Sequence, residues 1–393
     1  MIRKRPGYAL LLLLLLTAVF VSGHAKAETS VLLTFTGDCT LGSEESKKGL
    51  DTSLVSTVKT KGYDYFFANF REMFEQDDQT VINFEGVLSD YKGQEFKSKT
   101  YRFRGTTDFV KILTGSSIEA CSLANNHIND FGKQGEESTK ATLEENGIHW
   151  FQRYKPYIYE KDGIRIAFVS LHNIWNEFDK VKALLQSLKE EQKVNATVVC
   201  WHAGREYRGA HENNVDRTSK TMIKYGADLI IMCHPHVLQG IDIYEDRCVF
   251  YSLGNFVFGG NDKIRTEKFK LDKTVSSLYS MVVQVRMLFS DNGEYLGQHP
   301  VIYPVYTSSA APANNYQPYR VNAEDAVPIR DALQEDSNFR IPDITVGPDG
   351  LSKIDLGYIA AFDGVEFPNA DQNGPRGIPE AADPAPSRET KSN

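Results

Sequence analysis

Short apolar runs rich in β-branched and aromatic residues alternate along this chain with segments of helical periodicity, and this alternation constrains the fold most. It is typical of a mainly parallel or mixed β-sheet covered by helices on both faces. We therefore predict an α/β protein. The strand-like runs are Ser30–Thr36, Thr80–Asn83, Ile118–Leu123, Arg165–Ser170, Ala196–Trp201, Asp228–Cys233 and Cys248–Ser252, with further strands in Ser277–Phe289. The helix-like segments are Tyr65–Gln76, Gly135–Asn146, Asp179–Gln192, Thr218–Tyr225 and Ala323–Leu333.

The composition permits a large core and argues against one class of partner. Hydrophobic residues make up 41% and charged residues 24% of 393 residues, an ordinary globular balance. The formal net charge is -8, and no basic stripe is visible. A nucleic-acid-binding protein would show one, so we expect no nucleic acid among the partners.

Residues 1–27 have the features of a signal peptide or a membrane anchor. Arg3, Lys4 and Arg5 precede an apolar run from Tyr8 to Val21, and Ala25-Lys26-Ala27 follows as a small-x-small cleavage pattern. The run is shorter than the roughly 20 residues that span a bilayer, which favours cleavage over anchoring. Either alternative predicts an extracytoplasmic protein, secreted or anchored to the outer face of the membrane.

The other end of the chain and the cysteines are less informative. We expect a C-terminal extension over 307–366 and a disordered tail over 367–393, because the tail is mostly polar and rich in Pro and Gly. Five cysteines lie in or beside apolar runs without a framework spacing. We interpret them as small buried core residues.

Unusual polar residues follow six of the predicted strands, each at or just past the carboxyl end. In open α/β sheets, ligands bind at the carboxyl ends of strands, so we expect these residues to converge on one rim. They are Gly37-Asp38, Asn83 to Gly86, Asn125-Asn126-His127, His202 with Gly204 and Glu206, His234-Pro235-His236, and Gly254-Asn255.

Carboxylates, amide oxygens and imidazoles together make a suitable ligand set for divalent metals. Each piece also has a plain structural explanation. Gly-Asp is a common turn, Glu85 can begin a helix, and a lone His202 is more often a hydrogen-bonded core residue. The pair His234 and His236 is harder to explain by local structure alone. The occurrence of such residues after six different strands is harder still to explain in that way. His172 lacks neighbouring ligands, and we interpret it as an ordinary histidine. His211 lies in a polar stretch near Arg208, so substrate contact is one alternative and plain surface exposure the default one.

The same residues, in the same order, resemble the motifs of CapA-type capsule synthesis proteins over about residues 30 to 306. This family is associated with poly-γ-glutamate capsules and is similar in fold to the calcineurin-like metallophosphoesterases. The resemblance implies two packed mixed β-sheets flanked by helices, a four-layer sandwich, over residues 28–306. The motifs are Gly37-Asp38, Asn83-x-Glu85, Leu123 to His127, His202-x-Gly204-x-Glu206-Tyr207, His234 to Gly240 and Tyr251 to Phe256.

The resemblance also implies a role for each residue. Divalent ions, possibly two, of Mn, Fe, Zn or Mg, would bind at Asp38, Glu85, Asn126, His202, His234 and His236. Asp38 and His236 would hold the first ion, Asn126, His202 and His234 the second, and Glu85 would bridge them. His127 would be the general acid. Apart from the resemblance, Arg205 and Arg208 flank the His202 loop and suit an anionic substrate, although a solvated surface position is the plainer alternative for both. We interpret Glu206 and Asn255 as substrate-binding or supporting residues.

Two positions depart from the wider phosphoesterase pattern. Phosphoesterases usually carry histidine two residues after the first aspartate, and this chain has Thr40 there. The bridging acid is Glu85 instead of aspartate. CapA-type proteins resemble this chain in both respects. The departures therefore support the resemblance to that family and argue against ordinary phosphatase activity.

Two functions follow as hypotheses. The first is a metal-dependent hydrolase, metallophosphoesterase-like, acting in the synthesis or export of poly-γ-glutamate or a similar capsular polymer. The second is a non-enzymatic component that binds an anionic polymer or a membrane-bound synthase subunit through the same pocket.

Overall fold

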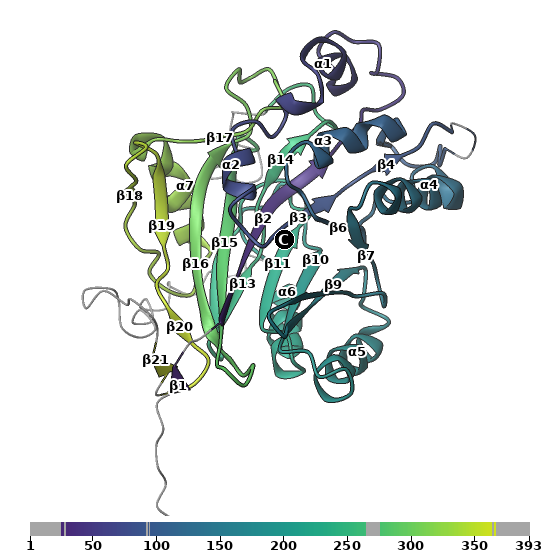
Figure 1. The fold of residues 1–393 in the computed structure, drawn as a ribbon. Helices are drawn as coiled ribbons and strands as arrows, with labels where there is room; N and C mark the ends of the chain where they lie inside the picture. The colour runs from purple at the N-terminus through teal and green to yellow at the C-terminus, as the bar shows by residue number, and fades with distance from the viewer. Residues whose placement is uncertain are drawn as a thin grey trace, which may run out of the picture.

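Two β-sheets packed face to face form the centre of the molecule (Figure 1). The structure is a computed structural model and describes residues 25–26, 29–91, 93, 95–264, 276–363 and 365–366. In the smaller sheet, four central strands are parallel and the two edge strands are antiparallel to them. Its order is β12 (Ile241–Tyr244), β13 (Arg247–Phe250), β11 (Leu229–Cys233), β10 (Ala196–His202), β9 (Ile164–His172) and β8 (Tyr157–Lys161).

The larger sheet combines a parallel half with an antiparallel half. Its parallel half is β2 (Thr29–Thr40), β3 (Gln79–Phe84), β6 (Ala120–Ser122) and β7 (His149–Phe151), with β14 (Asn255–Phe258) on the other side of β2. The long strand β15 (Tyr279–Phe289) pairs antiparallel with β2, and β16 (Tyr295–Tyr306) pairs antiparallel with β15 (Figure 1). Shorter strands continue this half: β17 (Tyr319–Arg320), β18 (Thr345–Val346), β19 (Ser352–Asp355) and β20 (Ile359–Ala360).

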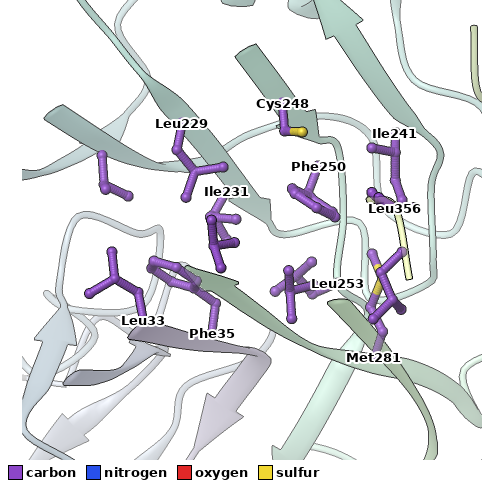
Figure 2. Close-up of a cluster of buried hydrophobic side chains, with 14 of the residues drawn as sticks. Leu33, Phe35, Leu229, Ile231, Ile241, Cys248, Phe250, Leu253, Met281 and Leu356 are labelled. Atoms are coloured by element: carbon purple, nitrogen blue, oxygen red, sulfur yellow. The ribbon is translucent and has the colours of Figure 1, made fainter. Parts of the chain in front are cut away.

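Buried aliphatic and aromatic side chains fill the space between the sheets. Figure 2 shows Leu33 and Phe35 of β2 close to Leu229 and Ile231 of β11, and all four are at most 4% exposed. Alternate residues of β2 point into this core because successive side chains in a strand face opposite sides. The same contacts hold the carboxyl ends of the two sheets together, which is where the polar motifs lie.

Helices cover the outer face of each sheet. Over the larger sheet lie α1 (Leu54–Lys61), α2 (Arg71–Phe74), α3 (Val110–Thr114) and α4 (Gly132–Glu145), with short 3₁₀ turns at Tyr63–Tyr65 and Thr107–Phe109. Over the smaller sheet lie α5 (Phe178–Glu190) and α6 (Asn213–Lys224). These four layers confirm the predicted fold class of two mixed sheets flanked by helices. Two short pairs complete the structure: β4 (Val87–Leu88) with β5 (Arg104–Gly105), and β1 (Ala25–Lys26) with β21 (Val365–Glu366).

One predicted helix is largely absent. The pattern over Tyr65–Gln76 predicted a continuous helix, and the structure has only the four residues of α2. Phe66 and Phe67 are both fully buried. Neighbours in a helix point about 100° apart, so one helix lying on a sheet would bury only one of them well. The chain instead turns through this segment and buries both.

Other predictions hold with shifted ends. β2 continues four residues past the predicted Thr36 and so carries Asp38 inside the strand. Ala323–Leu333 is helical, as α7 (Ala323–Glu335). All five cysteines are free and buried, which confirms their interpretation as core residues.

Residues beyond 306 share the core of the preceding residues. Buried side chains of α7, among them Ile329 and Leu333, join the cluster between the sheets, and β17, β19 and β20 pair with β16. The predicted targeting segment 1–27 lies outside the described residues apart from Ala25–Lys26, and the predicted tail 367–393 lies wholly outside them. Within the described part, no helix has the length and apolar character that crossing a membrane requires.

Leu333→Ala should lower the free energy of unfolding by about 2–5 kcal/mol, because it leaves a cavity in the main core. Val327→Ala on the same helix is the matched control, since Val327 is 47% exposed. It should change stability by less than about 1 kcal/mol. Urea unfolding of both variants measures the difference. Equal effects would mean that α7 does not contribute to the core.

The free energy of unfolding of Glu119→Gln, measured relative to that of the wild type at the same pH, should be higher at pH 8 than at pH 5. Burial raises the pKa of Glu119 from 4.5 to about 7. The folded state therefore holds this proton more tightly than the unfolded chain, and the group's contribution to stability falls as pH rises from 4.5 to about 7. Glutamine carries no charge and can still accept the bond from the Thr80 amide at 2.7 Å. Urea unfolding across this range tests it, with exposed Glu190→Gln as the control. A parallel pH dependence in all three proteins would contradict this assignment.

Candidate metal centre

The polar residues predicted to converge do come together, at one edge of the two sheets. Asp38 lies in β2, Glu85 follows β3, His202 ends β10, and His234 and His236 follow β11. The strands β2 and β3 are parallel, as are β10 and β11, so their carboxyl ends share this edge. The side chains of Asp38, Glu85 and His202 are at most 2% exposed.

A close approach of two backbones places Asp38. The Asp38 amide donates to the Gly254 carbonyl at 2.9 Å, which ties β2 to the start of β14. A Cβ on Gly37 would lie 2.2 Å from that same carbonyl oxygen, so only glycine fits there. The Gly-Asp pair is therefore a packing requirement that also directs the carboxylate. Its Oδ1 accepts from the Asn83 amide at 2.7 Å.

Glu85 is the most unusual group of the site. The residue is fully buried, and among the described residues neither of its carboxylate oxygens has a hydrogen-bond partner. Burial, followed by the nearby charge of Asp38, raises its pKa well above 4.5. A buried carboxylate without a partner is costly, and such groups are normally paired or bound to a metal.

One group of ligand-type atoms surrounds Glu85 on the side of Asp38. Single ligand atoms of Asp38, Glu85 and His236 lie within 4.8 Å of one another. His236 Nδ1 lies 3.3 Å from Asp38 Oδ2 and 3.0 Å from Asn255 Oδ1. Burial opposes a charge on His236, but the carboxylates of Glu85 and Asp38 raise its pKa to about 10. Asn255, predicted as a substrate or supporting residue, thus contacts His236.

A second group also includes Glu85. Ligand atoms of Glu85, His202 and His234 also lie within 4.8 Å of one another. His202 Nε2 is 2.7 Å from Asn126 Oδ1 and 3.0 Å from His234 Nδ1. Burial and the neighbouring His234 lower the pKa of His202 well below 6.5, and burial and His236 lower that of His234 to about 3. Both imidazoles are therefore neutral, the form that ligates metals.

The His234-Pro235-His236 loop adopts backbone angles that residues with side chains rarely take. His234 has φ +109° and His236 has φ +58°. Such strain persists where the surroundings enforce it, commonly at functional sites. Here the His234 amide donates to Asp38 Oδ2 at 3.2 Å, which helps to hold the loop.

His127 lies at the entrance to the cluster and is fixed by Asp130. Its Nδ1 is 2.7 Å from Asp130 Oδ2, and its Nε2 is 3.7 Å from Glu85 Oε1. The ring also packs on Phe103, with ring centres 4.5 Å apart. Asp130 Oδ2 accepts from the Phe103 amide, and Oδ1 forms a 2.8 Å ion pair with Lys99. Asp130 therefore directs Nε2 toward the site.

The three rim residues predicted to bind substrate are placed differently from one another. Arg205 is exposed and lies outside the buried cluster, and Arg208 is half-buried, with its carbonyl accepting from Gln239. Glu206 is exposed, but one of its carboxylate oxygens lies within 4.8 Å of ring nitrogens of His234 and His236.

Thr40 does not point its hydroxyl into the cluster as a ligand. It is fully buried, and its Oγ1 donates to the Glu85 carbonyl at 2.8 Å. The position that carries histidine in phosphoesterases thus serves to fix the backbone of Glu85.

Sequence reasoning placed Asn83 on the rim without giving it a role, and it missed Asp130 and His172. Asn83 donates to Asp38 and lies 3.2 Å from His202 Nδ1. Its spacing two residues before Glu85 was the available signal, just as Asp130 lies three residues after His127. His172, which we interpreted as ordinary, lies beside the site, with its Nδ1 3.0 Å from the His202 carbonyl.

The residues fit divalent cations. Two groups of ligand-type atoms share Glu85, each contains at least one imidazole, and the shared carboxylate has both oxygens unpartnered within the described part of the chain. Imidazole and carboxylate together suit Mn, Fe and Zn, and carboxylates suit Mg.

Fold and site together define an α/β protein of metallophosphoesterase-like architecture with a candidate metal centre. The family model of the bacterial capsule synthesis protein PGA_cap matches residues 32–260, more than half of the chain. The chain therefore belongs to this family, as the resemblance implied.

Individual relatives agree with this assignment. The chain is 26% identical over 294 residues to the capsule biosynthesis protein CapA of Bacillus anthracis, covering 65% of this chain and 69% of the relative. It is 26% identical over 254 residues to the PGA biosynthesis protein CapA of Bacillus subtilis (strain 168), covering 59% and 67%. A probable polyglutamine synthesis accessory protein of Mycobacterium tuberculosis is 23% identical over 235 residues, covering 51% and 62%.

Asp130→Ala should lower the free energy of unfolding by about 3 kcal/mol, because it strands a buried backbone amide, the His127 ring and the Lys99 charge. Asp90→Ala is the control, since Asp90 is exposed and its carboxylate accepts from the amide and hydroxyl of Thr107. It should cost less than about 1 kcal/mol. Urea unfolding of both variants decides, and a loss below 1 kcal/mol for Asp130→Ala would show that the carboxylate does not organise this loop.

Proposed function

We propose that this protein acts in the assembly or export of a capsular polymer through a two-cation, phosphoesterase-type hydrolytic centre. Membership of a capsule synthesis family supports the capsule-related role. The names of the Bacillus relatives, a capsule biosynthesis protein and a PGA biosynthesis protein, support poly-γ-glutamate as the polymer. The hydrolytic step is argued from the site.

The observation that carries the proposal is that Glu85 belongs to two groups of ligand-type atoms. It groups with Asp38 and His236, and separately with His202 and His234. Asn126 Oδ1 adds an oxygen next to His202. A buried carboxylate shared in this way is what two adjacent cations need as a bridge. When bound, such a pair lowers the pKa of a bound water and stabilises charge on the group being transferred.

The residues of the chain supply the remaining chemistry. His127 Nε2 faces the cluster while Nδ1 is held by Asp130, so the ring can deliver a proton to a leaving oxygen at one defined atom. Phe103 packs against the ring and limits its movement. Asn83 and Asn255 orient Asp38 and His236 by hydrogen bonds. Arg205 precedes Glu206 in the sequence and is exposed. Its guanidinium suits an anionic substrate.

We also propose that the protein works on the outer side of the cytoplasmic membrane. The support is the basic start, the apolar run and the cleavage pattern of residues 1–27.

The test is metal content and phosphodiester hydrolysis on one preparation of the full chain in mild detergent. After exposure to Mn²⁺ and desalting, we expect about two ions per chain, as two-metal hydrolases hold. Turnover of bis(p-nitrophenyl) phosphate should accompany them. The double variant Asn126→Ala, His202→Ala should retain at most one ion and lose at least about 100-fold in turnover, a loss typical of a removed catalytic feature.

A wild-type chain that binds neither Mn²⁺ nor Zn²⁺ and shows no turnover would overturn the hydrolytic centre. The non-enzymatic alternative, binding of an anionic polymer or a synthase subunit, would then remain and would be tested with poly-γ-glutamate. Turnover that survives the double variant at the wild-type rate would also overturn the proposal, because the activity would then belong elsewhere.

A further inference from the structure

Glu206 is an exposed acid held above the metal-ligand cluster. It belongs to the loop between β10 and α6, and one of its carboxylate oxygens lies within 4.8 Å of ligand nitrogens of both His234 and His236. His236 belongs to the group of Asp38, and His234 to the group of His202. Glu206 therefore offers an exposed carboxylate next to one histidine of each group.

The backbone around Glu206 is fixed to the neighbouring loop. The Tyr207 amide donates to the Pro235 carbonyl at 2.8 Å, and the Tyr207 ring packs on buried Val237. Gln239 donates to the Arg208 carbonyl at 2.9 Å. An exposed side chain on a mobile loop would be a poor ligand, but this loop is tied to the residues that carry the two histidines.

A second anchor comes from the end of α7. The Asp336 carboxylate accepts from the His211 amide at 3.0 Å and lies 2.9 Å from His211 Nδ1. The same carboxylate accepts from the Gly240 amide at 2.9 Å. Asp336 thus joins the loop of Glu206 to the loop of His234 and His236, and it lies outside the residues matched by the family model.

The two ligand groups are unequal without Glu206. The group with His202 has four candidate ligands, namely Glu85, Asn126, His202 and His234. The group with Asp38 has three, namely Asp38, Glu85 and His236, because the Thr40 hydroxyl donates to the Glu85 carbonyl and is not a ligand. Four protein ligands or more are usual where a cation is held firmly.

We propose that Glu206 is a metal ligand of the Asp38 side, supplying the ligand that Thr40 does not. This inference rests on the two-cation centre proposed above. It makes the donor set of that side three carboxylates and one imidazole, Asp38, Glu85, Glu206 and His236. Such an oxygen-rich set suits Mn²⁺. Because Glu206 approaches from the exposed face, the ion on this side is the more exchangeable of the two.

The test is isothermal titration of Mn²⁺ into the metal-free full chain, in mild detergent, with Glu206→Gln and Glu212→Gln in parallel. Glu212 lies on the same loop and outside the metal-ligand groups found among the described residues. Its variant therefore removes the same charge from the loop without removing a candidate ligand. We expect Glu206→Gln to weaken one of two binding events by at least about tenfold, since even indirect metal partners are worth 10–100-fold. The other event should stay within about threefold, and Glu212→Gln should bind like the wild type.

Each outcome has one meaning. Two events of unchanged affinity in Glu206→Gln would overturn the inference and leave the two-cation centre standing. Equal weakening in Glu206→Gln and Glu212→Gln would also overturn it, because general charge would then be the cause. Loss of both events together with a lower melting temperature of the metal-free chain would show a structural role and not ligation. A wild-type chain without Mn²⁺ binding would overturn the centre itself.

Discussion

The buried Glu85 carboxylate, without a hydrogen-bond partner in the described part of the chain, is the constraint around which the rest of the site is arranged. Leaving such a group unpaired in the interior is expensive. Three imidazoles nevertheless lie within 4 Å of its Oε1, those of His127, His202 and His236. The Glu85 carboxylate and these imidazoles are thus arranged around a common centre. A cation bound there would pair the buried charge of Glu85 and accept the lone pairs of the imidazole nitrogens.

The stacking of the two sheets makes this arrangement possible. Asp38 and Glu85 come from the larger sheet, and His202, His234 and His236 from the smaller one. The core between the sheets therefore sets the distance between carboxylates and imidazoles (Figure 2). Residues beyond 306 take part in that core through α7 and hold the rim loops through Asp336, so the site depends on a segment far from it in sequence.

Several parts of this picture follow from local patterns. Apolar runs of four to seven residues identify the buried strands because such strands are apolar on both faces. The polar residues after those runs identify the rim because parallel strands end at the same edge. The helix over Tyr65–Gln76 could not be excluded in this way, since the burial of both Phe66 and Phe67 is decided by what packs against them.

The sequence by itself determined the alternation of strands and helices, the family and the set of ligand-type residues, because these depend on residue type and order along the chain. The tertiary structure alone decided how that set divides. It showed that Glu85 belongs to two groups of ligand-type atoms, that Thr40 serves the backbone, that Asn255 supports His236, and that Glu206 lies near the histidines while Arg205 is exposed. These arrangements depend on contacts between residues 19 or more positions apart. The distance between such residues is set by packing of the two sheets and not by any local propensity.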